Sequence, residues 1–209
     1  GLSSCVIPAA NLPQAQLVPG MILLPAASLQ QVYHHLAGVA LLPAIATEQG
    51  RLIKTAPAAL AATVGLHDIA GQAQAKRALE IAAAGGHNIL LSGPPGTGKT
   101  MLAQALIDLL PPLCQEEVLE VTQLHSLADA RWSHLQLLPP LRAPHHSVSI
   151  SGLVGGGPQL RPGEVSLAHR GVLLLDEFTE FSTAALETLR QPLEERSVTV
   201  SRLQGSARY

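Results

Sequence analysis

The sequence predicts an α/β fold in which helices flank a parallel sheet, and three stretches carry that prediction. The first is HNILLSG (His87 to Gly93), a short apolar run ending in glycine that is typical of a buried parallel strand. The second is GVLLLDE (Gly171 to Glu177), an apolar run ending in two carboxylates. The third is SVTVSR (Ser197 to Arg202), a β-branched alternating run. Helical patterns separate these runs, as in parallel sheets.

Three segments between and beside these runs have the pattern of helices. HDIAGQAQAKRALEIAAAGG places Ala75, Leu79, Ala82 and Ala83 at helical spacing, with Asp68 near its start and a glycine pair at its end. TMLAQALIDLLPPL reads as a second helix closed by a proline pair, and STAALETLRQPLEE reads as a third. Residues 57–209 therefore form the expected α/β domain.

Residues 1–56 have a different character. VIPAANLPQAQLV predicts a short strand followed by a proline-punctuated turn, and SLQQVYHHLAG predicts a short helix with Ser28 as N-cap and Gly38 as stop signal. These elements cannot enclose a core by themselves. The stretch LLPAIATEQGRLIKTAPAAL mixes Pro, Gly and charge without periodicity, which indicates a linker with a boundary near Pro57.

Composition limits the range of functions. The 209 residues are 47% hydrophobic, 2% aromatic and carry a formal charge of −2, so neither an aromatic base-reading module nor an acidic partner is indicated. Cys5 and Cys114 form no CxxC pair, which argues against a zinc ribbon or a disulfide framework. The apolar run from Leu17 to Leu29 is interrupted by proline and glycine and is too short to span a bilayer. We expect a cytoplasmic protein without a membrane partner.

The stretch GPPGTGKT matches the phosphate-loop pattern G-x-x-x-x-G-K-[ST]. Its glycines let backbone N–H groups converge on phosphate oxygens, Lys99 neutralises the β- and γ-phosphates, and the Thr100 hydroxyl holds Mg²⁺. A strand and a helix are expected on its two sides, which is the context that the motif requires. The predicted ATP-binding residues are Gly93, Pro94, Pro95, Gly96, Thr97, Gly98, Lys99, Thr100 and Met101.

The carboxylate pair of GVLLLDE supplies the acidic side chains that the phosphate loop lacks. Asp176, at the end of a strand, is predicted to place Mg²⁺ together with Thr100, and Glu177 is predicted to activate water for attack on the γ-phosphate. Lys99 is the second predicted catalytic residue because it stabilises the transferred charge. The pair therefore points to ATP hydrolysis.

Several blocks of the chain resemble one family. GQAQAKRALEIAAAGGHNILLSGPPGTGKTMLAQAL, RAPHHSVSISGLVGGGPQLRPGEVSLAHRGVLLLDEF and LETLRQPLEERSVTVSR are similar to the magnesium-chelatase-like AAA+ ATPases of the helix-2-insert branch, and within them to the ComM (YifB) proteins. The likeness covers about residues 60–209. Residues 1–56 resemble the tail of the α+β, Lon-like domain that precedes the ATPase module in those proteins.

This resemblance offers an explanation for the long segment between the two nucleotide motifs. It implies a β-hairpin insert, with a strand over Ser147 to Val154, a turn at Gly155-Gly156-Gly157 and a return toward Val165. In the family such an insert points into the pore of a hexameric ring, and a second hairpin at SVTVSRLQGSARY would lie nearby. DNA contacts would then use a local set of arginines, namely Arg142, Arg161, Arg170, Arg196, Arg202 and Arg208. The alternative is that these arginines are solvated or paired with Glu164, Glu180 and Glu194.

The resemblance also implies parts of the ATP site. Asp68 and Ile69 would pass close to the adenine base, and the arginine finger, sensor residues and lid would lie beyond Tyr209. Residues 57–209 are therefore expected to be a partial core that hydrolyses ATP poorly alone.

His145 and His146 would point to opposite faces of a strand and so share no metal. Trp132 is expected to be a packing anchor.

Three functions remain open. The first is a hexameric, ATP-driven DNA motor for helicase or branch-migration steps of recombination in natural transformation, and the domain tail in residues 1–56 favours it. The second is a magnesium-chelatase-type motor that remodels a protein partner for metal insertion. The third is a module that binds nucleotide and assembles without catalysis.

Overall fold

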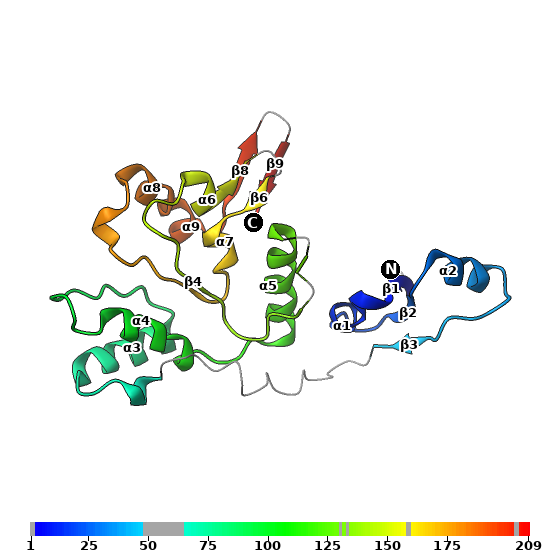
Figure 1. Ribbon diagram of the computed structural model, residues 1–209, viewed down its shortest axis with the longest axis horizontal. Coiled ribbons are helices and arrows are strands. Elements are labelled where there is room, and N and C mark those ends of the chain that lie inside the picture. Colours follow the sequence, from blue (N-terminus) through cyan, green and yellow to red (C-terminus); the bar gives the residue numbers. More distant parts are fainter. Residues whose placement is uncertain (1–2, 48–64, 130, 133, 158–159, 203–204) are drawn as a thin grey trace. The chain divides into compact units, whose positions relative to one another are not determined.

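The computed structural model describes residues 3–47, 65–129, 131–132, 134–157, 160–202 and 205–209. The chain divides into two compact units (Figure 1), which are described separately: Gly1–Thr55 with Cys114–Gln136, and Ala56–Leu113 with Leu137–Tyr209. The boundary expected near Pro57 lies outside the described residues. Among the described helices, none combines the length and the apolar character that crossing a membrane requires.

The first unit holds a three-stranded sheet in the order β1-β2-β3. β2 pairs in parallel with β1 and antiparallel with β3. Its elements are β1 (Ser4–Pro8), η1 (Ala9–Asn11), α1 (Leu12–Ala15), β2 (Ile22–Ala26), α2 (Leu29–Leu36), β3 (Ile45–Ala46) and α5 (Gln115–Ala128). The expected strand and short helix are confirmed as β1 and α2, whereas the segment expected to be a proline-punctuated turn is mostly helical and forms η1 and α1. Part of the expected linker instead forms β3.

Helix α2 begins and ends where the sequence predicts. The Ser28 side chain accepts a hydrogen bond from the backbone N–H of Gln31 at 3.4 Å, and Gly38 follows the helix with φ +71°. A positive φ at this place suits glycine because it has no Cβ.

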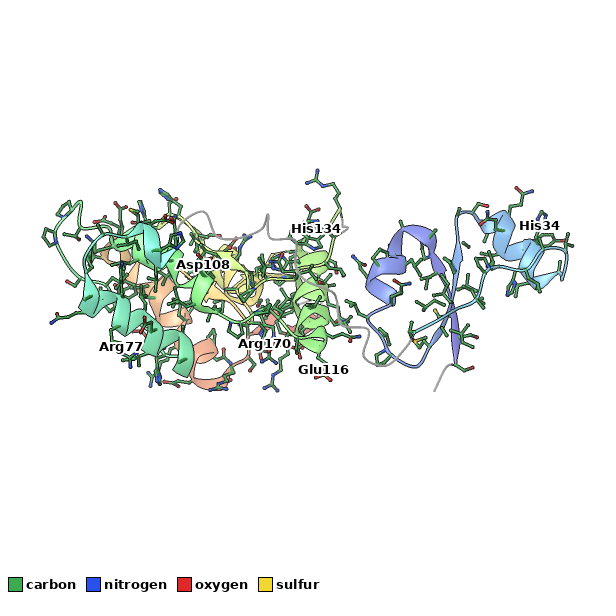
Figure 2. All side chains as sticks on the ribbon, turned by 90° about the horizontal axis from the view of Figure 1, so that it is seen from below. His34, Arg77, Asp108, Glu116, His134 and Arg170 are labelled. Carbon is green, nitrogen blue, oxygen red and sulfur yellow. The ribbon has the colours of Figure 1, made fainter. Side chains whose placement is uncertain are left out.

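Helix α5 was not predicted, although its sequence has a helical pattern. The backbone N–H of Cys114 donates to Glu117 Oε2 at 2.9 Å at the start of the helix. Val118, Val121 and His125 are buried on one face, which is the i, i+3, i+7 spacing of an amphipathic helix. Glu116 and His134 lie near its opposite ends (Figure 2). The Trp132 ring packs between His125 and His134, with centroid distances of 4.6 and 4.0 Å, in line with the expected packing role.

The second unit carries the two nucleotide motifs. Its elements are η3 (Leu66–Asp68), α3 (Ala73–Gly85), α4 (Lys99–Ala105), η4 (Ile107–Leu109), β4 (Leu141–Arg142), α6 (Ile150–Val154), β5 (Gly155–Gly156), β6 (Arg161–Pro162), α7 (Glu164–Leu167), β7 (Val172–Leu173), η5 (Phe178–Glu180), α8 (Thr183–Thr188), α9 (Arg190–Glu195), β8 (Thr199–Arg202) and β9 (Gly205–Arg208). The three predicted helical segments are confirmed as α3, as α4 with η4, and as α8 with α9.

A small apolar core holds α3 and α4 together. Leu79, Leu102 and Ala105 are at most 2% exposed, and Ile69 and Leu106 complete the buried cluster. The opposite face of α3 is polar, with Arg77 exposed to solvent and paired with Glu80 (Figure 2). This division into apolar and polar faces is what the helical spacing of the sequence predicted.

The prediction of a strand over His87 to Gly93 is wrong, because the structure has an irregular connection there. Ile89 and Leu91 pack against the core of α3 and α4, whereas Leu90 is 79% exposed. The segment thus alternates inward and outward like a strand, but no strand in the described part of the chain pairs with it. Without ladder hydrogen bonds it stays an extended connection.

Within the described part of the second unit, β4 and β7 are the strands that pair in parallel. Leu141 lies opposite Val172, and the backbone N–H of Leu174 donates to the Arg142 carbonyl at 2.8 Å. A Cβ on Gly171 would come within 2.0 Å of the Pro140 carbonyl oxygen, so glycine is required where the two strands approach. GVLLLDE is therefore a strand as predicted, although its apolar residues are half-buried and its paired part is short.

The expected hairpin insert differs in detail. Ser147 to Val154 is not a strand, because Ser149 caps helix α6 by accepting a hydrogen bond from Gly152 N at 3.0 Å. Two of the three glycines form β5 rather than a turn, and Gly155 pairs antiparallel with Pro162 of β6. Since β5 and β6 hold two residues each, the hairpin is shorter than expected.

The C-terminal hairpin is formed by β8 and β9. These strands pair antiparallel with each other, so SVTVSR contains the predicted strand but does not join the parallel sheet. The β8–β9 hairpin lies beside β6 (Figure 1), and the Tyr209 hydroxyl donates to the Leu160 carbonyl. The two hairpins are therefore neighbours, as the resemblance implied.

Candidate functional site

The phosphate loop has the backbone that its sequence predicts. Gly96 and Gly98 have φ angles of +80° and +78°, in the left-handed region that glycine enters without a steric penalty. The Thr97 hydroxyl donates to the Pro94 carbonyl at 2.9 Å, which closes the turn. The loop leads directly into α4, whose first turn presents free N–H groups. This arrangement suits a bound phosphate.

Lys99 and Thr100 are the first two residues of α4. The Lys99 ammonium group donates to the carbonyl oxygens of Gly93 and Pro94 at 2.9 Å each, so it lies over the loop. From there it reaches the place where the β- and γ-phosphates of a nucleotide would be cradled.

The two nucleotide motifs meet through one hydrogen bond. The Thr100 hydroxyl donates to Asp176 Oδ2 at 3.1 Å, although 76 residues separate the two in sequence. Neighbouring ligands of an octahedral Mg²⁺ ion, at about 2.1 Å from the metal, are about 3 Å apart. A hydroxyl and a carboxylate at this separation are oxygen donors of the type that Mg²⁺ takes, so the pair fits the ion that the sequence implies.

Asp176 and Glu177 follow β7 in a tight turn. Glu177 has a φ of +52°, and its backbone N–H donates to Asp176 Oδ1 at 3.0 Å. The Glu177 side chain is 68% exposed, and its Oε2 lies 3.5 Å from His146 Nδ1. The carboxylate is thus accessible to a ligand or water, as a general base requires.

Two polar contacts that the sequence did not predict hold the start of α3, one to the phosphate loop and one to the segment before the helix. The Gln72 side-chain amide donates to the Thr97 carbonyl, and the Lys76 ammonium group donates to the Ile69 carbonyl. Gln72 itself has a φ of +52° at the start of α3. Its position directly after Gly71 is a signal for a special backbone, but nothing in the sequence indicates its partner.

Asp68 and Ile69 lie at the end of η3, before α3, and Met101 lies in the first turn of α4. Asp68 Oδ2 accepts from the Gly65 backbone N–H at 2.9 Å, and Ile69 is 5% exposed within the core of α3 and α4. Met101 is 42% exposed on α4. An adenine contact by Asp68 and Ile69 therefore stays a prediction.

A partly buried ion pair joins β4 to α7. Arg142 donates from Nε to Glu164 Oε2 at 2.6 Å and from Nη2 to Oε1 at 2.7 Å. The hydrogen bond with Glu164 raises the pKa of the Arg142 guanidinium, against the opposing effect of burial. The alternative of pairing with glutamate is thus confirmed for Arg142, which leaves it poorly suited to bind DNA.

The histidine pair departs from the expectation in its orientation. His145 and His146 do not lie on a strand, and their rings stack with a centroid distance of 4.0 Å and an interplanar angle of 38°. No cluster of three or more metal-ligating side chains occurs in the residues that the structure describes. What the sequence missed is that His146 faces Glu177.

The site has the parts of a P-loop nucleotide-binding protein: a glycine loop, a lysine and threonine at a helix start, and an aspartate at a strand end. The sequence model of the family described as magnesium chelatase, subunit ChlI, matches residues 65–209. The chain belongs to this family, whose members are AAA+ P-loop proteins. The family fits the nucleotide and Mg²⁺ chemistry of the site.

Individual relatives support the same assignment. An uncharacterised protein of Mycobacterium tuberculosis, Rv2897c, is 47% identical over 212 residues, which cover 100% of this chain and 41% of the relative. The Escherichia coli protein YifB is 52% identical over 69% of this chain and 29% of its own length. The competence protein ComM of Haemophilus influenzae is 51% identical over 70% of this chain and 29% of its own length. The chain therefore spans less than half the length of these relatives.

Proposed function

We propose that the native protein is an ATP-driven, hexameric DNA motor that acts in helicase or branch-migration steps of recombination. The observation that carries the ATPase part is the 3.1 Å hydrogen bond between Thr100 and Asp176, which unites the phosphate loop with the strand-end carboxylates. In this proposal Thr100 and Asp176 hold Mg²⁺, Lys99 stabilises the transferred phosphoryl charge and Glu177 activates water.

The DNA part of the proposal is supported by likeness and by arrangement. A relative that is 51% identical over 70% of this chain is named a competence protein. The β5–β6 and β8–β9 hairpins lie side by side in this unit, so both can face one DNA strand in a ring of subunits. Arg208 lies on β9, and its guanidinium donates to Ser197 Oγ at 3.2 Å on an exposed surface.

A second candidate is a motor that remodels a protein partner for metal insertion. It is favoured by the name of the family whose model matches residues 65–209, the magnesium chelatase subunit. Because the ATP chemistry would be the same, the two candidates differ only in what stimulates hydrolysis.

The first test compares ATP hydrolysis by the native full-length polypeptide with and without single-stranded and forked DNA. We expect DNA to raise the rate, and Glu177→Gln to bind ATP normally but lower turnover at least about a hundredfold, the usual loss of a general base. Glu180→Gln, which makes the same change at an exposed glutamate three residues further along the chain, is the matched control and should hydrolyse ATP nearly as fast as the wild type.

The outcomes separate the candidates. Normal basal turnover without DNA stimulation would favour the protein-remodelling motor. Wild-type turnover in Glu177→Gln would contradict the ATPase roles assigned above.

A further inference from the structure

Gln72 has a backbone conformation that its residue type does not favour. Its φ is +52°, it directly follows Gly71 with a φ of +67°, and it stands at the N-cap position of α3. The left-handed region crowds the Cβ of an L-residue, so glycine or asparagine would take this place with less strain. Strained residues persist where the surrounding contacts hold them, and they gather at functional sites. A specific contact of the glutamine side chain is therefore expected.

The side-chain amide of Gln72 makes its contact with the phosphate loop. Its Nε2 donates to the carbonyl oxygen of Thr97, and a Cβ on Gly98 would lie 3.6 Å from the same nitrogen. The amide therefore lies against the peptide bond that joins Thr97 to Gly98. The Gln72 side chain makes no capping hydrogen bond to α3, so its polar end serves the loop and not its own helix.

The backbone on both sides of Gln72 is held in place. Its carbonyl accepts from the Lys76 N–H at 3.0 Å, and the Lys76 ammonium group donates to the Ile69 carbonyl. Further along α3, Leu79 is fully buried and belongs to the same apolar cluster as Leu102 of α4. A side chain on such a support can orient a loop at little further entropic cost.

The hydrogen bond to Thr97 sets the direction of the next N–H group in the loop. The peptide bond between Thr97 and Gly98 is trans, and the C=O and N–H groups of a trans peptide point in opposite directions. A carbonyl held toward Gln72 therefore turns the Gly98 N–H away from Gln72. Among the described residues this N–H donates to no backbone carbonyl, so it can serve a phosphate oxygen at the start of α4.

We infer that Gln72 is a positioning residue that aims the Gly98 N–H at the phosphates of a bound nucleotide by holding the Thr97 carbonyl. The inference rests on the proposed nucleotide function, in which the loop from Gly93 to Thr100 cradles the phosphates. Gln72 acts on the loop and not on the nucleotide. Because the Gly98 N–H would bind the phosphates equally in the ground state and the transition state, misplacing it weakens binding and leaves the chemical step unchanged.

The test replaces the amide of Gln72. In the native full-length polypeptide we would measure kcat and KM for ATP, and the Kd of a fluorescent ADP analogue, in Gln72→Met and Gln72→Asn. Methionine keeps the length and removes the donor, whereas asparagine keeps the amide and tolerates a positive φ but is one methylene shorter. We expect both changes to raise KM and Kd about tenfold, as for a lost hydrogen bond to a charged group, with kcat within about twofold of the wild type.

Displacement of the analogue by inorganic tripolyphosphate separates the phosphate loop from the base. Tripolyphosphate has no adenine, so Gln72→Met should weaken its binding by the same factor as that of ADP. A loss for ADP alone would place the effect on the segment around Ile69 and overturn the positioning role. Wild-type affinity in Gln72→Asn would do the same, because the shorter amide does not span the distance to the Thr97 carbonyl.

Two controls make the result decisive. Gln74→Met makes the same change at an exposed glutamine in the first turn of α3 and should keep the wild-type KM and Kd. Without nucleotide, Gln72→Met and Gln74→Met should unfold at the same urea concentration, and a clearly lower midpoint for Gln72→Met would assign the amide to folding instead.

Lys99→Ala reports on the proposed function separately. If Lys99→Ala abolishes ADP binding while Gln72→Met binds ADP like the wild type, the positioning role is wrong and the nucleotide function stands. Undiminished ADP binding by Lys99→Ala would contradict the proposed function itself.

Discussion

At the scale of single residues, the candidate site is built from a few contacts between distant parts of the sequence. Thr100 and Asp176 join the two nucleotide motifs, and His146 faces Glu177. The Arg142–Glu164 pair joins β4, the strand that precedes His146 in the chain, to α7. Its two short hydrogen bonds are partly shielded from water, which makes it a stronger pair than an exposed one.

The Arg142–Glu164 pair gives a prediction for stability. Glu164→Ala should lower the free energy of unfolding by about 2 kcal/mol, because it leaves a partly buried guanidinium without its carboxylate. The matched control is Glu194→Ala, which breaks the exposed Arg190–Glu194 pair and should cost at most about 0.5 kcal/mol. Urea denaturation measures both, and equal losses would show that shielding does not strengthen the inner pair.

At the scale of elements, close backbone approaches fix the hairpin that follows α6. A Cβ on Gly163 would come within 2.2 Å of the Gly155 nitrogen and 2.6 Å of the Leu153 carbonyl oxygen. Both are backbone atoms, which cannot move aside as the end of a side chain can. Gly163 has a φ of −92°, so glycine is needed here because there is no room for a Cβ atom and not because of backbone strain.

Gly163→Ala is therefore expected to destabilise the unit by about 3 kcal/mol, the upper part of the usual range for overpacking. Gly86→Ala is the contrasting control, since Gly86 has a φ of +62° and open space around its Cβ position. Left-handed strain alone should cost about 1 kcal/mol there. Thermal unfolding of the two variants measures the difference, and a Gly163→Ala variant as stable as the wild type would refute the packing argument.

At the scale of the whole molecule, we expect nucleotide binding and folding to be linked in one of the two units. The phosphate loop and Asp176 belong to the unit of Ala56–Leu113 and Leu137–Tyr209. A ligand that binds only the folded state stabilises that state by mass action. The stability of this unit should therefore depend on Mg²⁺ and ATP.

Mg·ATP at a hundredfold excess over its Kd is expected to raise the free energy of unfolding of this unit by about 2.7 kcal/mol. Removal of Mg²⁺ with EDTA should reduce the gain, and Lys99→Ala should abolish most of it. Scanning calorimetry with Glu177→Gln, which should bind ATP without hydrolysing it, gives the measurement. Full stabilisation of Lys99→Ala would contradict the proposed phosphate contact.

The sequence by itself determined the local structure of the site. Gly96 and Gly98 adopt the left-handed φ angles of a phosphate loop, Lys99 begins a helix, and Leu79 and Ala82 are buried at helical spacing, because these features depend on neighbours in the chain. The acidic pair that ends GVLLLDE was likewise predictable from the sequence, since an apolar run ending in charge marks a strand end.

Only the tertiary structure decided which segments meet. It gave His87 to Gly93 no partner strand among the described residues, formed a turn and helix α6 over Ser147 to Val154, and packed the ring of His145 against that of His146. It also brought His146 to Glu177, which no local pattern announces. Strand pairing and register depend on contacts between residues far apart in the chain, and the physical rules that govern local conformation do not fix those contacts.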